Sequence, residues 1–151
     1  MPSVSLRSRA ILVAIPVLVF ALGLVGLAVN AANYRGAVSA LEDRMESYVY
    51  SVLGAMEMDG AGGFEVEDDF ADPRLTQPGS GLYVTVQGMD SLWQSPSALG
   101  VQLPESPLIE AGRAMFTEPG GDLDYFTYQY GIGWERDDGS ITPFTVSVLV
   151  G

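Results

Sequence analysis

The stretch AILVAIPVLVFALGLVGLAV, residues 10–29, is uncharged and almost wholly apolar. A helix rises about 1.5 Å per residue, so these 20 residues reach about 30 Å, the thickness of a bilayer's hydrocarbon core. Arg7 and Arg9 precede the stretch, and all 19 acidic residues follow it. Because positive charge stays in the cytoplasm, we expect residues 1–9 to be cytoplasmic, residues 10–30 to form a transmembrane helix and residues 31–151 to be extracytoplasmic.

A cleaved signal peptide is the main alternative for this stretch, because Val29-Asn30-Ala31 resembles a small-residue cleavage site. The apolar core of a signal peptide usually covers only about 7 to 15 residues. Here the stretch has bilayer length and continues into a helical pattern, so we expect a retained anchor. Pro16 is compatible with it, since lipid leaves the backbone no better choice than a locally kinked helix.

The part after residue 30 has 121 residues (151 minus 30), enough for one compact domain. Its formal charge is 5 minus 19, or −14, which argues against nucleic acid as a partner and favours cations. The chain has no histidine, cysteine or lysine, so it cannot supply a Ser-His-Asp or Cys-His site, a Schiff base or a typical zinc site. Paired carboxylates would suffice for a secreted glycoside hydrolase, but no protected pair stands out. We expect no catalytic residue and no bound cofactor other than a sensed cation.

An amphipathic helix is predicted from Asn33 to about Met58, ended by the glycines at 60, 62 and 63. Apolar residues spaced 4, 3, 4, 3, 4 form one stripe: Tyr34, Val38, Leu41, Met45, Tyr48 and Val52. A second stripe contains Val49, Leu53 and Met56. Such spacing is typical of a dimeric coiled-coil seam and also of a helix that packs on its own domain, and the sequence leaves both open.

The remaining residues predict an antiparallel sheet of about five strands. Alternating or β-branched and aromatic residues mark Leu82–Gln87, Leu92–Gln94, Ala114–Thr117, Tyr125–Tyr130 and Ile141–Val150. The sequence Asp137-Asp138-Gly139-Ser140 predicts a hairpin turn. Ser95–Pro107 predicts a loop, Ser106–Arg113 a short helix, and the acidic segment before Pro73 no regular element. The expected fold class is α+β, with the long helix on one face of the sheet.

Seven acidic residues are candidates for binding a divalent cation, since Mg²⁺ and Ca²⁺ prefer carboxylate oxygens. Five of them form a run and two form a second group: Glu65, Glu67, Asp68, Asp69 and Asp72, then Asp122 and Asp124. An EF-hand that starts at Asp122 is excluded, because Thr127 stands where the loop requires glycine. A solvated acidic loop explains the run equally well.

Four aromatic residues, Trp93, Tyr125, Tyr128 and Trp134, are candidates for lining a ligand pocket. Aromatic residues at strand spacing more often pack in a core or pair across strands. We therefore expect a packing role for them.

Two stretches, QPGSGLY at residues 77–83 and LWQSPSALG at residues 92–100, resemble sensor histidine kinases related to PhoQ. A membrane helix followed by an extracytoplasmic α+β domain is also similar to these two-component sensors. The resemblance implies a PAS-like domain of the PhoQ-DcuS-CitA type, a homodimer in the bacterial inner membrane, with the sensor domain in the periplasm. It also implies a second membrane helix, a HAMP linker and a kinase core beyond Gly151, where the phosphoacceptor histidine and the contact with a response regulator would lie.

The family resemblance implies that divalent cations bridge a carboxylate patch to anionic lipid headgroups, and that cationic peptides relieve the bridged state. The chain is then the sensor part of a two-component kinase that detects divalent cations or cationic peptides. The alternative is a self-contained, membrane-anchored envelope binding or assembly protein without a kinase. A second apolar stretch and a histidine-containing helix encoded after codon 151 would favour the sensor.

Overall fold

The computed structural model of the protein describes residues 6–58, 63–67, 70–121, 123–136 and 139–151, with only the backbone for residues 6–9. Contacts divide the chain into two units, residues 1–41 and 42–151. The helix α1 (Leu6–Gly54) begins in the first unit and ends in the second.

The first unit contains the apolar part of α1. All side chains from residue 10 to residue 37 are exposed. An 18-residue window of this helix has a mean hydropathy of 2.8, and none of it is buried. This part of α1 is long and apolar enough to cross a membrane, which is compatible with the predicted anchor and equally with a signal sequence.

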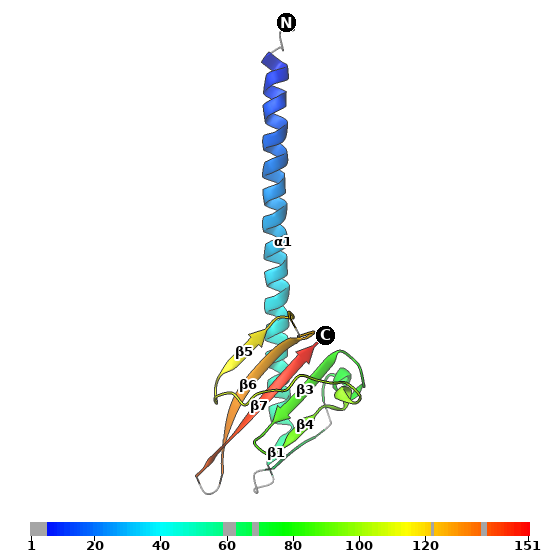
Figure 1. Cartoon of the computed structure of the whole chain (residues 1–151), viewed down its shortest axis with the longest axis vertical. Coiled ribbons are helices and arrows are strands. Elements are labelled where there is room, and N and C mark those ends of the chain that lie inside the picture. The colour runs from blue at the N-terminus through cyan, green and yellow to red at the C-terminus, as the bar shows by residue number, and fades with distance from the viewer. Residues whose placement is uncertain (1–5, 59–62, 68–69, 122, 137–138) are drawn as a thin grey trace. The chain divides into compact units, whose positions relative to one another are not determined.

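Five antiparallel strands form the sheet of the second unit, in the order β4-β3-β7-β6-β5 (Figure 1). Their bounds are β3 (Leu82–Gln87), β4 (Leu92–Gln94), β5 (Ala114–Thr117), β6 (Phe126–Glu135) and β7 (Ile141–Val150). A separate ribbon pairs β1 (Met56–Met58) with β2 (Phe64–Val66). Two 3-10 helices, η1 (Pro73–Thr76) and η2 (Pro96–Ala98), flank β3 and β4. The predicted α+β class is confirmed.

One face of the sheet is aliphatic and packs against the end of α1. Val84 pairs with Val148 and Val86 with Val146, and all four side chains are fully buried. Tyr50 of α1 lies 6.4 Å from the ring of Tyr130, which pairs with Val146 on this face. Burying such side chains contributes roughly 1.5 to 3 kcal/mol each, so this layer is the main source of stability.

The helix face in this core lies between the two predicted stripes. Met45 and Val52 from the first stripe are fully buried, and so is Val49 from the second, while Met56 is buried just after the helix ends. These four positions therefore pack inside their own domain. The dimer seam stays a prediction for the part of the first stripe that precedes Met45.

The opposite face of the sheet is polar at its centre and apolar at one end, where Tyr83 and Leu149 are buried together with Ala98. Thr85, Ser147 and Gln129 lie side by side on β3, β7 and β6, and they are only 3%, 0% and 6% exposed. Residues 99–113, here called the strap, run over this face. Ile109 N in the strap donates a hydrogen bond to Thr145 Oγ1 at 2.9 Å, and the hydroxyl oxygens of Thr85 and Ser106 are 3.3 Å apart.

The strap contradicts the predicted helix over Ser106–Arg113, because no helix forms there. Its backbone bonds to the sheet instead: Gly112 N donates to Gly131 O at 2.8 Å, and Gly131 N donates to Arg113 O at 2.9 Å. These long-range bonds replace the local bonds that a helix would use.

Two boundaries near the end of α1 were also predicted wrongly. The helix ends at Gly54 rather than near Met58, since Met56–Met58 pairs with Phe64–Val66. That pairing also places a strand where no regular element was expected. The glycines at 60 and 62 lie outside the described residues.

The predicted hairpin between β6 and β7 is confirmed. Glu135 pairs with Ile141, and Arg136 N donates to Ser140 O at 2.8 Å. Gly139 has φ +78°, a conformation that glycine adopts without strain. Asp137 and Asp138 lie outside the described residues.

Gly131 is predicted to be essential for seating the strap. A Cβ at this position would lie 2.2 Å from the carbonyl oxygen of Glu110. We expect Gly131→Ala to lower the free energy of unfolding by about 1–3 kcal/mol, because the strap backbone has to move away. Urea unfolding of the full chain in detergent, followed by the fluorescence of Trp93 and Trp134, measures the change. Gly120→Ala is the control, since a Cβ there meets nothing within 4 Å, and equal midpoints for both variants would contradict the prediction.

Candidate functional site

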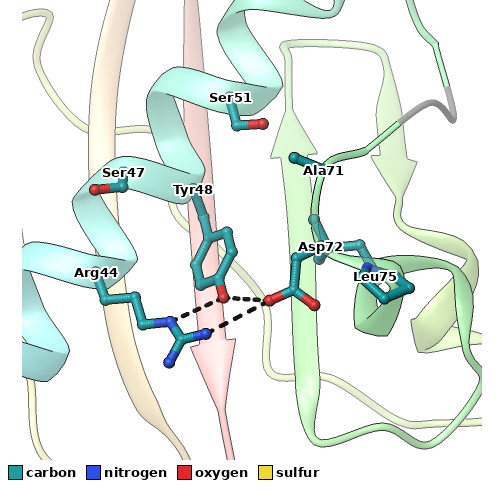
Figure 2. Close-up of a pocket in the computed structure, with 8 residues that line it drawn as sticks. Arg44, Ser47, Tyr48, Ser51, Ala71, Asp72 and Leu75 are labelled. Carbon is teal, nitrogen blue, oxygen red and sulfur yellow. Dashed lines mark hydrogen bonds and ion pairs between the residues drawn. The ribbon is translucent and has the colours of Figure 1, made fainter.

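A groove of about 530 Å³ lies in the second unit, between α1 and the segment that leads into η1. Its walls come from four residues of α1 and four of the facing segment: Arg44, Ser47, Tyr48 and Ser51, and Ala71, Asp72, Pro73 and Leu75. Figure 2 shows Arg44, Tyr48 and Asp72 pointing toward one another across this groove.

Three residues that line the groove, Arg44, Tyr48 and Asp72, belong to a hydrogen-bonded cluster. Tyr48 Oη donates to Asp72 Oδ2 at 2.5 Å and accepts from Arg74 Nη2 at 2.7 Å. Arg74 Nη2 also lies 2.9 Å from Asp72 Oδ2. Arg44 Nε donates to Tyr48 Oη at 3.1 Å, and Arg44 Nη2 lies 3.7 Å from Asp72 Oδ2. The cluster therefore ties α1 to η1.

Asp72 is held by these partners rather than left open to a cation. Its Oδ1 accepts a hydrogen bond from Arg74 N at 3.0 Å and so caps η1. Hydrogen bonds from the Arg74 side chain, then from Tyr48 and the Arg74 backbone, hold the pKa of Asp72 well below its ordinary value. A carboxylate whose two oxygens already accept charged donors is a poor first choice as a metal ligand.

Glu65 and Glu67 of the acidic run lie on the ribbon. Glu65 pairs directly with Glu57 of β1, and all three glutamates are exposed. Glu67 N donates to Ala55 O at 3.0 Å, and alternation along the strand places Glu67 on the same face as Glu65. Directly paired residues have Cβ atoms about 4.5–5.5 Å apart, so Glu57 and Glu65 repel each other.

Asp124 lies far from this ribbon. It lies two residues before Phe126, which pairs with Val150, whereas Phe64 of the ribbon contacts Phe144 toward the other end of β7. At about 3.3 Å per residue, the two places are roughly 20 Å apart along the strand. Asp68, Asp69 and Asp122 lie outside the described residues. Within the described part of the chain, no three His, Cys, Asp or Glu side chains form a group that could hold a metal ion.

The four aromatic candidates have different surroundings. The ring of Trp93 lies 5.9 Å from Phe70, and that of Tyr125 lies 5.8 Å from Tyr83. Tyr128 is buried on the aliphatic face, while Trp134 is 41% exposed. The ring contacts of Trp93 and Tyr125 and the burial of Tyr128 agree with the expected packing role, whereas the exposed Trp134 does not.

The two stretches that resemble sensor kinases lie against each other in the fold. Gly79 N donates to Ser97 O at 3.0 Å, which joins residues 77–83 to residues 92–100. Ser95 Oγ accepts from Val84 N at 3.0 Å and lies 2.7 Å from Ser97 Oγ, with both serines buried. Their residues build the junction between η1, η2 and β3, which is a structural role.

Comparisons with known proteins do not assign the chain to a family. No protein-family model, no curated protein and no solved structure matches it. The relation to PhoQ-like kinases therefore stays a prediction.

Sequence reasoning missed Tyr48 and Arg74 as partners of Asp72, and Glu57 as the partner of Glu65. A signal for the first set was present, because Asp72-Pro73 is a typical N-cap and N1 pair, and Arg44 and Tyr48 are four residues apart on one helix face. No local signal marks Glu57, whose place depends on the pairing of β1 with β2.

The Tyr48–Asp72 hydrogen bond is predicted to stabilise the domain in a pH-dependent way. We expect Asp72→Asn to lower the free energy of unfolding by about 1–3 kcal/mol at pH 7, because a charge-assisted contact is lost. The folded-state pKa of Asp72 is lowered, so its contribution is present above the unfolded pKa of about 3.9 and is lost as the pH falls further. The deficit of the variant should therefore shrink between pH 5 and pH 2 in urea titrations.

Tyr48→Phe and the double variant complete a thermodynamic cycle for this hydrogen bond. Non-additivity of about 0.5 kcal/mol or more at pH 7 is the expected coupling. Additive effects, or a deficit of Asp72→Asn that does not change with pH, would contradict the assigned role.

Proposed function

We propose that the chain is a membrane-anchored sensor domain on the extracytoplasmic side of the membrane. One observation carries the proposal: the single helix α1 contains both the apolar stretch and the buried residues Met45, Val49 and Val52. A change of packing around these three side chains acts directly on the helix that carries the membrane segment. An anchor that served only as a tether would not need to supply core residues of the domain.

The sensed species in this proposal is a divalent cation or a cationic peptide close to anionic lipid. Support comes from the exposed Glu57–Glu65 pair and from the formal charge of −14 after residue 30 (5 minus 19). Carboxylates and lipid phosphates repel each other, and a cation between them offsets that repulsion. Glu67 lies beside the pair, and Asp68, Asp69, Asp122 and Asp124 remain further candidates of the proposal.

A histidine kinase is the proposed output. The 151 residues contain no histidine, so the phosphoacceptor would belong to a different segment of a larger protein. The resemblance of residues 77–83 and 92–100 to sensor kinases supports this part. The same proposal includes a homodimer formed through the part of the first stripe that precedes Met45. A cognate response regulator is then an indirect partner.

The membrane topology is tested by cysteine labelling, because the chain has no cysteine of its own. Leu99, which is 76% exposed, and Ser3 are each replaced singly, as Leu99→Cys and Ser3→Cys. We expect a membrane-impermeant maleimide to label the first variant in intact spheroplasts and the second only after lysis. The electrophoretic mobility of the chain tells an anchor from a cleaved signal. Labelling of both variants, or release of the domain from the membrane, would overturn the anchored topology.

The cation role is tested by thermal unfolding of the full chain in detergent. We expect about 10 mM Mg²⁺ to raise the midpoint by roughly 1–4 °C over NaCl of equal ionic strength, since cross-strand charge pairs contribute roughly 0.2–1 kcal/mol. The double variant Glu57→Gln/Glu65→Gln should start at a higher midpoint and lose most of the gain.

Asp90→Asn/Glu110→Gln removes the same charge elsewhere and is the matched control for this experiment. It should keep the gain from Mg²⁺. An equal gain for both double variants would show that Mg²⁺ acts only through the overall charge, and no gain in the unmodified chain would end the cation role.

A further inference from the structure

A second cavity, of about 490 Å³, lies over the polar face of the sheet, between the strap and the β3–β4 hairpin. Polar side chains from β3, β4 and the strap line it: Thr85, Gln87, Gln94, Glu105 and Ser106. The volume falls within the range of about 300–1,000 Å³ that is typical of small-molecule sites.

The sheet beneath this cavity has an unusual composition for a protein interior. Thr85, Thr145 and Ser147 are at most 3% exposed, and Thr145 Oγ1 already accepts a hydrogen bond from Ile109 N of the strap. The hydroxyls of Thr85 and Ser106 share one hydrogen bond of 3.3 Å, which leaves each with further bonding capacity. A polar floor under an irregular segment favours a site for a polar ligand group.

Hydrogen-bond acceptors dominate this floor. Gln87 Nε2 donates to Gly88 O at 2.7 Å with one of its two N–H groups, and Oε1 of the same side chain is an acceptor. The carboxylate of Glu105 only accepts, and each hydroxyl oxygen has two lone pairs. The neutral groups can accept or donate, and Glu105 can only accept, so a ligand group with N–H donors is complementary to the lining.

The charge of the residues that line the cavity also favours a ligand with N–H donors. Among the described residues, Glu105 is the only ionisable side chain that lines the cavity, and no described cation lines it to hold an anionic ligand. The field of an acidic domain adds to the local attraction for a positive group. An ammonium group satisfies both the donor requirement and the charge.

Apolar side chains provide a second kind of contact. Met89, Leu92 and Leu108 line the same cavity, and they are 66%, 58% and 41% exposed. Exposed aliphatic groups around a polar floor suit a ligand that has an apolar body and one polar head.

We propose that this cavity binds a small organic ammonium ion with an apolar body, such as an arylalkylamine. The ammonium group donates to the carboxylate of Glu105, with Gln87 Oε1 and the hydroxyls of Thr85 and Ser106 as further acceptors. The apolar body packs on Leu92 and Leu108. This site is separate from the Glu57–Glu65 pair, so it goes beyond the proposed cation role and can fail without affecting it.

Calorimetric titration of the full chain in a nonionic detergent, with empty micelles as the blank, tests the proposal. The probes are phenethylamine, the neutral phenethyl alcohol and the anionic 3-phenylpropionate, which share an aromatic body and differ in the head group. We expect saturable binding of the amine, at least tenfold weaker binding of the alcohol and no binding of the acid. Glu105→Gln should weaken binding of the amine at least fivefold.

Glu110→Gln is the matched control, because it removes the same charge from an exposed strap residue that does not line the cavity. It should change the affinity less than twofold. Gln87→Met is a second variant at the floor of the cavity. It should lower the affinity for phenethylamine and leave the midpoint of urea unfolding near that of the unmodified chain. The proposal is overturned if no probe saturates below about 10 mM, if the acid binds as well as the amine, or if the two glutamate variants have the same effect.

Discussion

The pairing of β7 with β3 on one side and with β6 on the other is the constraint on which the rest of the domain depends. Its register places Val146 and Val148 on one face and Thr145 and Ser147 on the other. A shift by one residue would expose the valines to the strap and turn the hydroxyls toward α1. The aliphatic core and the polar cavity are therefore two consequences of one hydrogen-bond register.

Charge is distributed unevenly over this framework. Only five of the arginines lie after residue 30, and two of them, Arg44 and Arg74, converge on Asp72. That carboxylate is neutralised locally and serves to fix η1 to α1. The Glu57–Glu65 pair gains no comparable partner in the described structure, and its repulsion is opposed by the backbone bonds of the ribbon and by the burial of Met56 and Val66. Within the described part of the acidic run, Asp72 thus has a structural role and Glu65 is one member of a repelling pair.

The sequence was a good guide wherever a local pattern determines the structure. The bounds of β3, β4, β5 and β7 agree with the alternation and turn residues, because burial of one face imposes a period of two. It failed at residues 106–113 and at the ribbon, where backbone groups bond to partners far along the chain. The candidate site was the part least predictable from the sequence, because Tyr48 and Glu57 gain their roles only through tertiary contacts. An apolar stripe on a helix likewise does not indicate which neighbouring element covers it.

Phe144 connects the ribbon that carries the Glu57–Glu65 pair with the wall of the cavity under the strap. Its ring is fully buried and packs edge-on against Phe64 of the ribbon, with centroids 5.4 Å apart. A Cβ at Gly88, which lines the strap-side cavity, would lie 3.0 Å from the same ring. Protein interiors are packed too densely for such a ring to move without displacing its neighbours. The ribbon and the cavity wall therefore both pack against the ring of Phe144. The ring can lie this close to position 88 because glycine has no side chain.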